Sequence, residues 1–382
     1  MKVLYDHQIF SIQSYGGISR YFYELMNIFD ITKDVEFRLS LIHSSNEYLR
    51  KIRSLEENGV FNKKPYKLKY ISSLFGARND SYQINQNFSQ TEISTGDYDV
   101  FHPTYYDSYF LEHISEKPFV LTVHDMIHEI YPELFPNANV TISKKKRLIE
   151  AANEIICVSN NTKDDLLSIY NDLDASRIHV IYHGNSLNPS FTAPLLIDQN
   201  PGPQIGKYLL YVGTRWSYKN FSFFIQSTIR LLKKYPWLTI VCVGGGKFTS
   251  DELQFFDQNG IISRVYQYSV NDAQLASFYK NSLAFVFPSI YEGFGIPILE
   301  AFACRCPTIC SNTSSLPEVA KDAAVYFNPK DILSIQRAIE SIILDGELRV
   351  AIVDRGSRYL QDYDWNNAAK LTKNVYNEAI ST

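Results

Sequence analysis

The sequence predicts an α/β protein made of two doubly wound, parallel-sheet domains that face each other across a cleft. Short β-rich apolar runs alternate with helical patterns along the whole chain, which is typical of parallel α/β layers. A chain of 382 residues is also too long for one ordinary core. A polar stretch rich in Pro and Gly, Thr192 to Lys207, interrupts the alternation once and predicts a linker.

The apolar runs give the expected strands in order. Those of the first half are Val3–Tyr5, Phe37–Ile42, Val100–His102, Phe119–Val123, Ile155–Val158 and Val180–Tyr182. Those of the second half are Tyr208–Val212, Leu238–Val243, Val265–Tyr268, Leu283–Phe287, Thr308–Ser311 and Val325–Phe327. We therefore expect domains at 1–192 and 207–364, and a helix within 365–382 that crosses back to the first domain.

Composition excludes several classes of protein. A net charge of −4 gives no general argument for nucleic-acid binding, and no apolar run is long enough to span a membrane. The chain opens with a strand pattern rather than a signal peptide, and its five cysteines, an odd number, fit a reducing compartment. Cys304, Cys306 and Cys310 lack the paired spacing of a metal site. These features predict a cytoplasmic location, with no bound metal.

The most informative segment is Tyr291–Glu300, in which Glu292 and Glu300 bracket a Gly-x-Gly turn and a proline. An apolar strand pattern precedes the segment and a helix pattern follows, so Gly295 and Ile296 would lie at a helix N-terminus. Backbone N–H groups there suit a phosphate, and the two carboxylates can accept hydrogen bonds from a polyol. A nucleotide sugar combines both features. The alternative is two unrelated helix glutamates.

A second segment follows the first strand of the second domain. Arg215 and Lys219 come after Gly213 and lie just before a helix pattern that begins near Asn220. Two cations beside a helix N-terminus oppose the helix dipole, and an anion bound between them removes that conflict. Arginine supplies a planar fork and lysine a point charge, which suits a pyrophosphate.

Three further turns follow expected strands, where ligands of open α/β sheets bind. Gly16 and Gly17 would let the backbone approach a ligand at a helix N-terminus, or simply form a tight turn. His124 would donate to a sugar hydroxyl or help to stabilise developing charge, or would be a structural histidine. Gly244 begins a Gly-Gly-Gly run that would bring backbone near a nucleotide, or would be a flexible loop.

Two basic segments stand out from the acidic background. Residues 50–78 carry many Lys and Arg with interleaved aromatics, which indicates contact with an anionic acceptor or a membrane surface, or a solvated face. The shorter run Lys144–Arg147 is interpreted as a solvated face.

Taken together, these residues resemble a glycosyltransferase of the two-domain GT-B type, in the large retaining family called family 4. The resemblance covers nearly the whole chain, and the motifs occur in the same order as in the family. The motifs that carry the family resemblance are Gly16-Gly17, His124, Arg215 with Lys219, Gly244 to Gly246, Glu292 to Glu300, and Ser315-Leu316-Pro317-Glu318-Val319. Within the family, the segments Tyr15 to Arg20 and His124 to Glu129, with Pro132 and Phe135, are most similar to bacterial mannosyl- and related transferases of surface polysaccharide assembly.

The resemblance implies a role for each matching residue. Arg215 and Lys219 would bind the donor diphosphate and stabilise it as the leaving group. Glu292 would contact the hydroxyls of the donor sugar, near the backbone N–H groups of Gly295 and Ile296. Glu300 would hold the ribose.

For the first domain, the resemblance implies that it binds the acceptor, while the second binds the nucleotide sugar. Gly17 would let a loop close over phosphate, and His124 would touch the sugar from the opposite wall. No metal is implied, since fixed cations and helix-end N–H groups can stabilise the departing diphosphate.

The expected reaction is transfer of a hexose, with mannose from GDP-mannose favoured, to a hydroxyl of a glycan or lipid-linked glycan. The family retains the anomeric configuration, so we expect front-face substitution. Residues 50–78 would give peripheral membrane contact. Two alternatives stay open: a nucleotide-sugar 2-epimerase or hydrolase of the same fold, and a non-catalytic nucleotide-sugar-binding protein.

Overall fold

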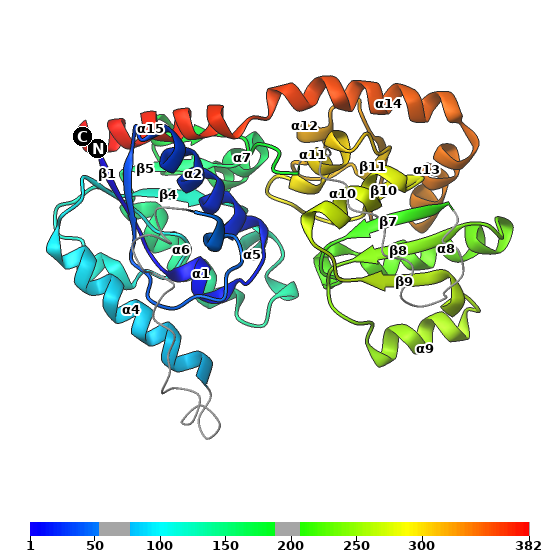
Figure 1. The fold of residues 1–382 in the computed structure, drawn as a ribbon, viewed down its shortest axis with the longest axis horizontal. Helices are drawn as coiled ribbons and strands as arrows, with labels where there is room; N and C mark the ends of the chain where they lie inside the picture. The colour runs from blue at the N-terminus through cyan, green and yellow to red at the C-terminus, as the bar shows by residue number, and fades with distance from the viewer. Residues whose placement is uncertain (53–76, 188–206, 382) are drawn as a thin grey trace. The chain divides into compact units, whose positions relative to one another are not determined.

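The computed structural model describes residues 1–52, 77–187 and 207–381 (Figure 1). The chain forms two compact units: Met1–His183 with Trp365–Thr382, and Gly184–Asp364. The last helix therefore belongs to the same unit as the N-terminus. Residues 192–206 of the expected linker lie outside the described residues, as does most of the basic segment 50–78.

The first unit is a parallel α/β layer structure. Its strands are ordered β2-β1-β3 and β4-β5-β6, and one parallel bridge between Phe101 and Phe119 connects the two sets. In β1 and β3, Tyr5 stands opposite His102. The strands are β1 Lys2–Tyr5, β2 Glu36–Leu39, β3 Val100–His102, β4 Val120–Val123, β5 Glu154–Cys157 and β6 Ile178–Val180. The helices are α1 Gln8–Ile12, α2 Gly17–Thr32, α4 Ala77–Thr95, α5 Ile127–Ile130, α6 Ala138–Ala151, α7 Asn160–Ile169 and α15 Trp365–Ser381.

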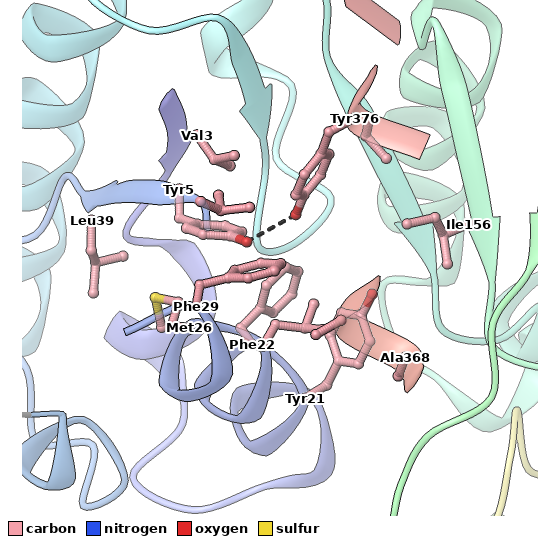
Figure 2. Packing of buried hydrophobic residues seen from close by; sticks show 14 of the residues in the cluster. Val3, Tyr5, Tyr21, Phe22, Met26, Phe29, Leu39, Ile156, Ala368 and Tyr376 are labelled. Atoms are coloured by element: carbon pink, nitrogen blue, oxygen red, sulfur yellow. Dashed lines mark hydrogen bonds between the residues drawn. The ribbon is translucent and has the colours of Figure 1, made fainter. Parts of the chain in front are cut away.

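Helix α15 is part of the core of the first unit. Figure 2 shows Tyr376 pointing at Tyr5, with their hydroxyl oxygens 2.8 Å apart. The ring of His102 continues this contact, since its Nδ1 lies 2.7 Å from the Tyr376 hydroxyl and its Nε2 lies 2.9 Å from Thr122 Oγ1. Burial lowers the pKa of His102 to about 3, so the ring is neutral. A buried polar chain thus ties α15 to β1, β3 and β4.

The second unit is one six-stranded parallel sheet of order β12-β11-β10-β7-β8-β9. Its strands are β7 Tyr208–Val212, β8 Thr239–Val243, β9 Val265–Tyr268, β10 Ala284–Phe287, β11 Thr308–Ser311 and β12 Val325–Phe327. Its helices are α8 Phe221–Lys234, α9 Ser250–Gln258, α10 Asp272–Asn281, α11 Ile296–Ala303, α12 Leu316–Ala320, α13 Ile332–Leu344 and α14 Gly346–Tyr359.

The strand order of the second unit reverses beside β7. From β7 the chain proceeds to β8 and β9, and then returns to place β10 on the other side of β7. The loops that leave the carboxyl ends of β7 and β10 therefore lie side by side, and the Ile290 N–H donates to the Tyr218 carbonyl at 2.8 Å. Such a switch point is where open α/β sheets bind ligands.

Each expected strand overlaps an observed one. Two boundaries differ most: β2 ends at Leu39, three residues before the expected end, and β6 begins at Ile178, two residues before the expected start. Among the described residues, β6 is an edge strand that pairs only with β5, and His179 and Val180 are half-buried. A strand with one neighbour and a partly solvated face gives a weak apolar pattern, so its boundary is poorly marked.

All five cysteines are buried and unpaired, as expected for structural residues. Burial raises the pKa of Cys304 and of Cys306 to about 12, which keeps both thiols protonated at neutral pH.

Candidate active site

Four glycines shape the loops at the carboxyl ends of β7 and β8. The Gly213 N–H donates to the Val243 carbonyl at 2.9 Å, which draws the two loops together. Gly244, Gly245 and Gly246 all have left-handed backbones, with φ of 86°, 70° and 74°. Residues with a Cβ atom are strained in this left-handed conformation, whereas glycine is not. The Gly-Gly-Gly run thus forms a turn whose backbone favours glycine at each of the three positions.

Arg215 lies under this turn. Its Nε and Nη2 donate to the Glu252 carboxylate at 2.7 and 3.2 Å. Nη1 donates to the carbonyls of Gly244 and Gly246 at 3.3 and 3.1 Å, and Nη2 donates to the Lys247 carbonyl at 2.8 Å. These contacts occupy all the N–H groups of the guanidinium. The Arg215 side chain is 5% exposed. In this structure Arg215 holds the glycine turn, and a phosphate would reach it only by displacing one of these acceptors.

Alanine at Gly245 is expected to lower the free energy of unfolding more than alanine at Gly246. Both positions carry the backbone cost of a left-handed L-residue, about 1–2 kcal/mol. A Cβ on Gly245 would also lie 2.7 Å from Arg215 Nη1 and 3.0 Å from the Gly213 carbonyl oxygen, whereas one on Gly246 meets nothing within 4 Å. Urea unfolding of the two variants measures the difference. Equal losses would contradict the packing of Arg215 against the turn.

Lys219 and Glu292 form the central contact of the second unit. Lys219 ends a short 3₁₀ helix, Ser217–Lys219, and its Nζ lies 2.6 Å from Glu292 Oε1. The rings of Tyr218 and Phe287 flank the ammonium, with centroids 5.0 and 5.6 Å away. Burial lowers the pKa of Lys219, but the Glu292 carboxylate and Tyr218 outweigh it, so the pKa lies above its ordinary value. Lys219 is therefore a cation held in place, and in this structure its ionic partner is Glu292.

Three consecutive hydroxyl residues support the loop that carries Glu292. The Thr313 hydroxyl donates to the Ile290 carbonyl at 2.8 Å, and Ser314 Oγ accepts from the Glu292 N–H at 3.0 Å. Ser315 Oγ, fully buried, lies 2.8 Å from the carbonyl oxygens of Glu292 and Phe294. Ser315 therefore supports the loop as well as preceding helix α12. The sequence signal for this role is the Thr-Ser-Ser run that follows β11, the strand beside β10.

Helix α11 begins next to this loop. Gly295, at its N-cap, has a left-handed φ of 116°, and a Cβ there would lie 3.0 Å from Leu316 Cδ2. Ile296 is the first helical residue, so its N–H points out of the helix end. Glu300, further along α11, is 5% exposed, and the Tyr279 hydroxyl donates to its Oε2 at 3.0 Å. Burial and the Glu300 carboxylate raise the pKa of Tyr279 well above its ordinary value. The two glutamates thus have different surroundings.

The first unit holds the other candidate residues. Gly16 has an extended backbone, with φ of 170°, and its missing Cβ makes room for the Gln13 side chain, whose Oε1 would lie 2.1 Å from such a Cβ. That Oε1 accepts from the Ser19 N–H at 3.2 Å, in the first turn of α2. Gly16 therefore serves a local contact, and Gly17 is the first, exposed residue of the helix.

His124 follows β4 and is 7% exposed. Its backbone N–H donates to the Tyr106 hydroxyl at 2.9 Å, and its ring packs edge-on against Tyr21, with centroids 5.3 Å apart. Burial lowers the pKa of His124 well below its ordinary value, and the neighbouring His183, His102 and Lys145 add to this effect. The ring is neutral at physiological pH, so it suits a hydrogen bond to a hydroxyl rather than charge stabilisation.

Lys145 holds the turn that carries His124. Its fully buried Nζ donates to the Asp125 carbonyl and to Glu129 Oε2, both at 2.9 Å. It also lies 5.0 Å from the centroid of the Tyr106 ring, whose hydroxyl holds the His124 N–H. The interpretation of Lys144–Arg147 as a solvated face is therefore wrong for Lys145. The helical period of α6 turns this residue inward, where a buried carboxylate and a carbonyl compensate its charge.

Comparisons with known proteins agree with this architecture. The model named Glycosyl transferases group 1 matches residues 196–359, and the model named Glycosyltransferase Family 4 matches residues 56–188. The O-antigen chain mannosyltransferase RfbU of Salmonella typhimurium is 31% identical over 254 residues, covering 66% of this chain and 68% of that protein.

The chain belongs to glycosyltransferase family 4.

A second relative of this family-4 chain is the O-antigen chain mannosyltransferase B of Escherichia coli, 29% identical over 282 residues, or 70% of this chain and 72% of that one. Among solved structures, Anabaena Alr3699/HepE in complex with UDP and glucose matches with a TM-score of 0.71 at 17% identity, covering 98% of both chains. Sucrose-phosphate synthase from Thermosynechococcus elongatus matches with a TM-score of 0.69 at 18% identity, also covering 98% of both. The predicted GT-B fold is confirmed, and the protein is a glycosyltransferase.

In this family-4 glycosyltransferase, each unit contributes its own candidate residues. The second unit brings together Lys219 with Glu292, and Arg215 with Gly244. It gives Arg215 and Lys219 separate partners, although they are four residues apart.

The basic segment 50–78 of the glycosyltransferase lies largely outside the described residues. Within them, Arg50 lies 3.5 Å from Glu47, and Lys51 lies 5.8 Å from the centroid of the Tyr48 ring. None of the described helices is long and apolar enough to cross a bilayer. Membrane contact through this segment stays a prediction.

Proposed function

We propose that this glycosyltransferase moves mannose from GDP-mannose to a hydroxyl of a glycan or lipid-linked glycan in surface polysaccharide assembly. The proposed sugar is supported by the names of its relatives, which include two O-antigen chain mannosyltransferases at 29% and 31% identity. A nucleotide-sugar donor is supported by the fold, since Anabaena HepE of the same fold binds UDP-glucose. The single observation that carries the proposal is the Lys219–Glu292 pair beside the N-terminus of α11.

The donor diphosphate would compete with Glu292 for the Lys219 ammonium. Both side chains are mostly shielded, with 18% and 14% exposed, so their attraction to a ligand is weakly screened. Once Lys219 turns to the phosphate, Glu292 can accept hydrogen bonds from the hydroxyls of the mannose. The Ile296 N–H at the start of α11 would add a donor toward the same phosphate. Arg215 would act indirectly, by holding the Gly244–Gly246 turn.

In the proposed reaction, the bond between mannose C1 and the β-phosphate oxygen breaks, and its electron pair stays with the phosphate. The acceptor hydroxyl oxygen bonds to C1 on the same face, and its proton passes to the departing phosphate. Lys219 and the α11 N-terminus stabilise the negative charge that grows on the leaving group. Neutral His124 would hydrogen-bond a sugar hydroxyl from the first unit. Retention follows from attack on the face that the phosphate leaves.

The proposal is tested with purified full-length protein, GDP-mannose and manno-oligosaccharide acceptors. Mass spectrometry should show one added hexose, and NMR should show that the new linkage keeps the anomeric configuration of the donor. Donor alone should be at most slowly hydrolysed. Interconversion of the sugar without an acceptor would instead establish the epimerase alternative, and an inverted linkage would exclude the front-face reaction.

Transfer is expected to persist in excess chelator, because Lys219 and the α11 N-terminus take the place of a metal at the diphosphate. The measurement is the initial rate with and without EDTA, with GDP-mannose held constant. A loss of activity that manganese restores would show that the diphosphate needs a metal.

GDP is expected to stabilise the protein against heat. At about 100 times its Kd, a ligand adds about 2.7 kcal/mol to the free energy of unfolding. For a unit of this size that raises Tm by roughly 5–10 °C. Differential scanning fluorimetry with GDP and UDP in parallel measures the effect. A larger shift with UDP would make the proposed base wrong, and no shift with either would make the nucleotide site wrong.

A further inference from the structure

Three ligating side chains converge within the first unit, and none of them is a candidate active-site residue. Glu154 opens β5, His179 lies in β6, and Glu378 lies near the end of α15. His179 Nε2 is 2.7 Å from Glu154 Oε2 and 3.5 Å from Glu378 Oε2, and one ligand atom of each residue lies within 4.8 Å of the other two. Side chains from three elements thus bring one nitrogen and two carboxylate oxygens together.

The hydrogen bond of His179 is to Glu154. The Nε2 atom of His179 carries at most one proton, and the 2.7 Å contact directs that proton to Glu154. The second carboxylate, from Glu378, approaches the same nitrogen at 3.5 Å and brings a like charge close to Glu154. Two carboxylate oxygens within 4.8 Å of each other repel. A cation placed among the three atoms would remove this repulsion.

We propose that Glu154, His179 and Glu378 form a structural Zn²⁺ site. The set of one imidazole nitrogen and two carboxylate oxygens suits zinc, whereas calcium and magnesium favour oxygen ligands alone. In a tetrahedral site with bonds of about 2.0–2.2 Å, the ligand atoms stand about 3.3 Å apart. The observed 2.7 and 3.5 Å lie on either side of that value. Side-chain exposure rises from 11% at Glu154 through 23% at His179 to 56% at Glu378, which leaves an open side for a water ligand.

The site would fasten the end of α15 to the sheet of the first unit. Ile156, two residues after Glu154 on the same face of β5, belongs to the same core cluster as Tyr376 and Ala379 of α15 (Figure 2). His179 stands opposite Ile156 in the register of β5 and β6, so it shares that face. Glu378 lies between Tyr376 and Ala379 in sequence. Zinc would add a bond across three elements that apolar packing already brings together.

The test uses full-length protein stripped of metal with a chelator and then dialysed. Isothermal titration with ZnCl₂ should show one site per chain, and saturating Zn²⁺ should raise Tm by several degrees through mass action. Substitution with Co²⁺ should give the strong visible absorption of a tetrahedral centre. Transfer activity should not change with zinc, because none of the three ligands is a candidate active-site residue.

The decisive variant is Glu378→Gln, since this exposed side chain can change without loss of the fold. It should lose the zinc-dependent shift in Tm and bind Zn²⁺ at least tenfold more weakly. Glu116→Gln, another exposed glutamate on the same unit, should behave as the wild type. The proposal is overturned if the wild type does not bind Zn²⁺ stoichiometrically, or if the wild type and Glu378→Gln bind it equally well. The cluster would then be explained by the His179–Glu154 hydrogen bond alone.

Discussion

The Lys219→Met variant is expected to lower kcat by about 10²–10³-fold, the usual loss when one preorganised donor to a developing anion is removed. Methionine keeps the apolar stem between the rings of Tyr218 and Phe287 but takes away the charge 2.6 Å from Glu292. The departing diphosphate then loses its fixed cation. The measurement is steady-state transfer from GDP-mannose at saturating acceptor.

Two further variants make the Lys219 result interpretable. Lys321→Met removes another lysine of the second unit, whose Nζ lies 2.8 Å from Asp362 in an exposed pair, and should leave transfer near normal. The double variant Lys219→Met with Glu292→Gln removes the carboxylate left without its cation, so a stability defect would be relieved while the loss of transfer would remain. Near-normal transfer by a folded Lys219→Met protein would exclude Lys219 from the leaving-group site.

The Lys145→Met variant is expected to lower the free energy of unfolding by about 3–5 kcal/mol, as is usual when one partner of a buried ion pair is removed. The Lys145 and Glu129 side chains are 0% and 3% exposed, so the Glu129 carboxylate would stay buried without its cation. The Asp125 carbonyl would also lose its donor. Urea denaturation followed by circular dichroism measures the loss.

A neighbouring lysine provides the control for Lys145. Lys146 lies one position further along α6, is 54% exposed, and stands 3.7 Å from Glu150. Lys146→Met should change the free energy of unfolding by less than about 0.5 kcal/mol. If the two variants lost equal stability, the burial of the Lys145–Glu129 pair would have no energetic consequence. If Glu129→Gln failed to relieve Lys145→Met, the unpaired carboxylate would not be the cause.

Arg215 illustrates where inference from sequence reached its limit. Its position before a helix N-terminus predicted a cation that faces an anion, and the helix-dipole argument is sound for the loop as a whole. The anion in the structure is a protein group, Glu252, which lies 37 positions away at the start of α9. The remaining N–H groups of Arg215 donate to the carbonyls of Gly244, Gly246 and Lys247. Local sequence contains no information on whether such an anion is a ligand or a distant side chain.

The glycine turn and the His124 turn show the opposite outcome. The Gly-Gly-Gly run was expected to follow a strand; it lies directly after β8, and its three left-handed residues in succession favour glycine. His124 was expected at the carboxyl end of a strand, and it lies directly after β4. Both predictions depended only on neighbours within a few residues, where backbone sterics and strand periodicity decide.

The sequence by itself determined the alternation of strands and helices, the turns after the strands, the GT-B class and the family. The alternation and the turns follow from patterns of period 2 and 3.6, which local forces control, whereas the GT-B class and the family follow from the resemblance of the motifs to family 4. The tertiary structure alone decided that Lys219 contacts Glu292 and that Arg215 contacts Glu252. The reason is the order of the sheet: β7 has β10 on one side and β8 on the other, so its carboxyl-end loop meets two loops that are remote in sequence.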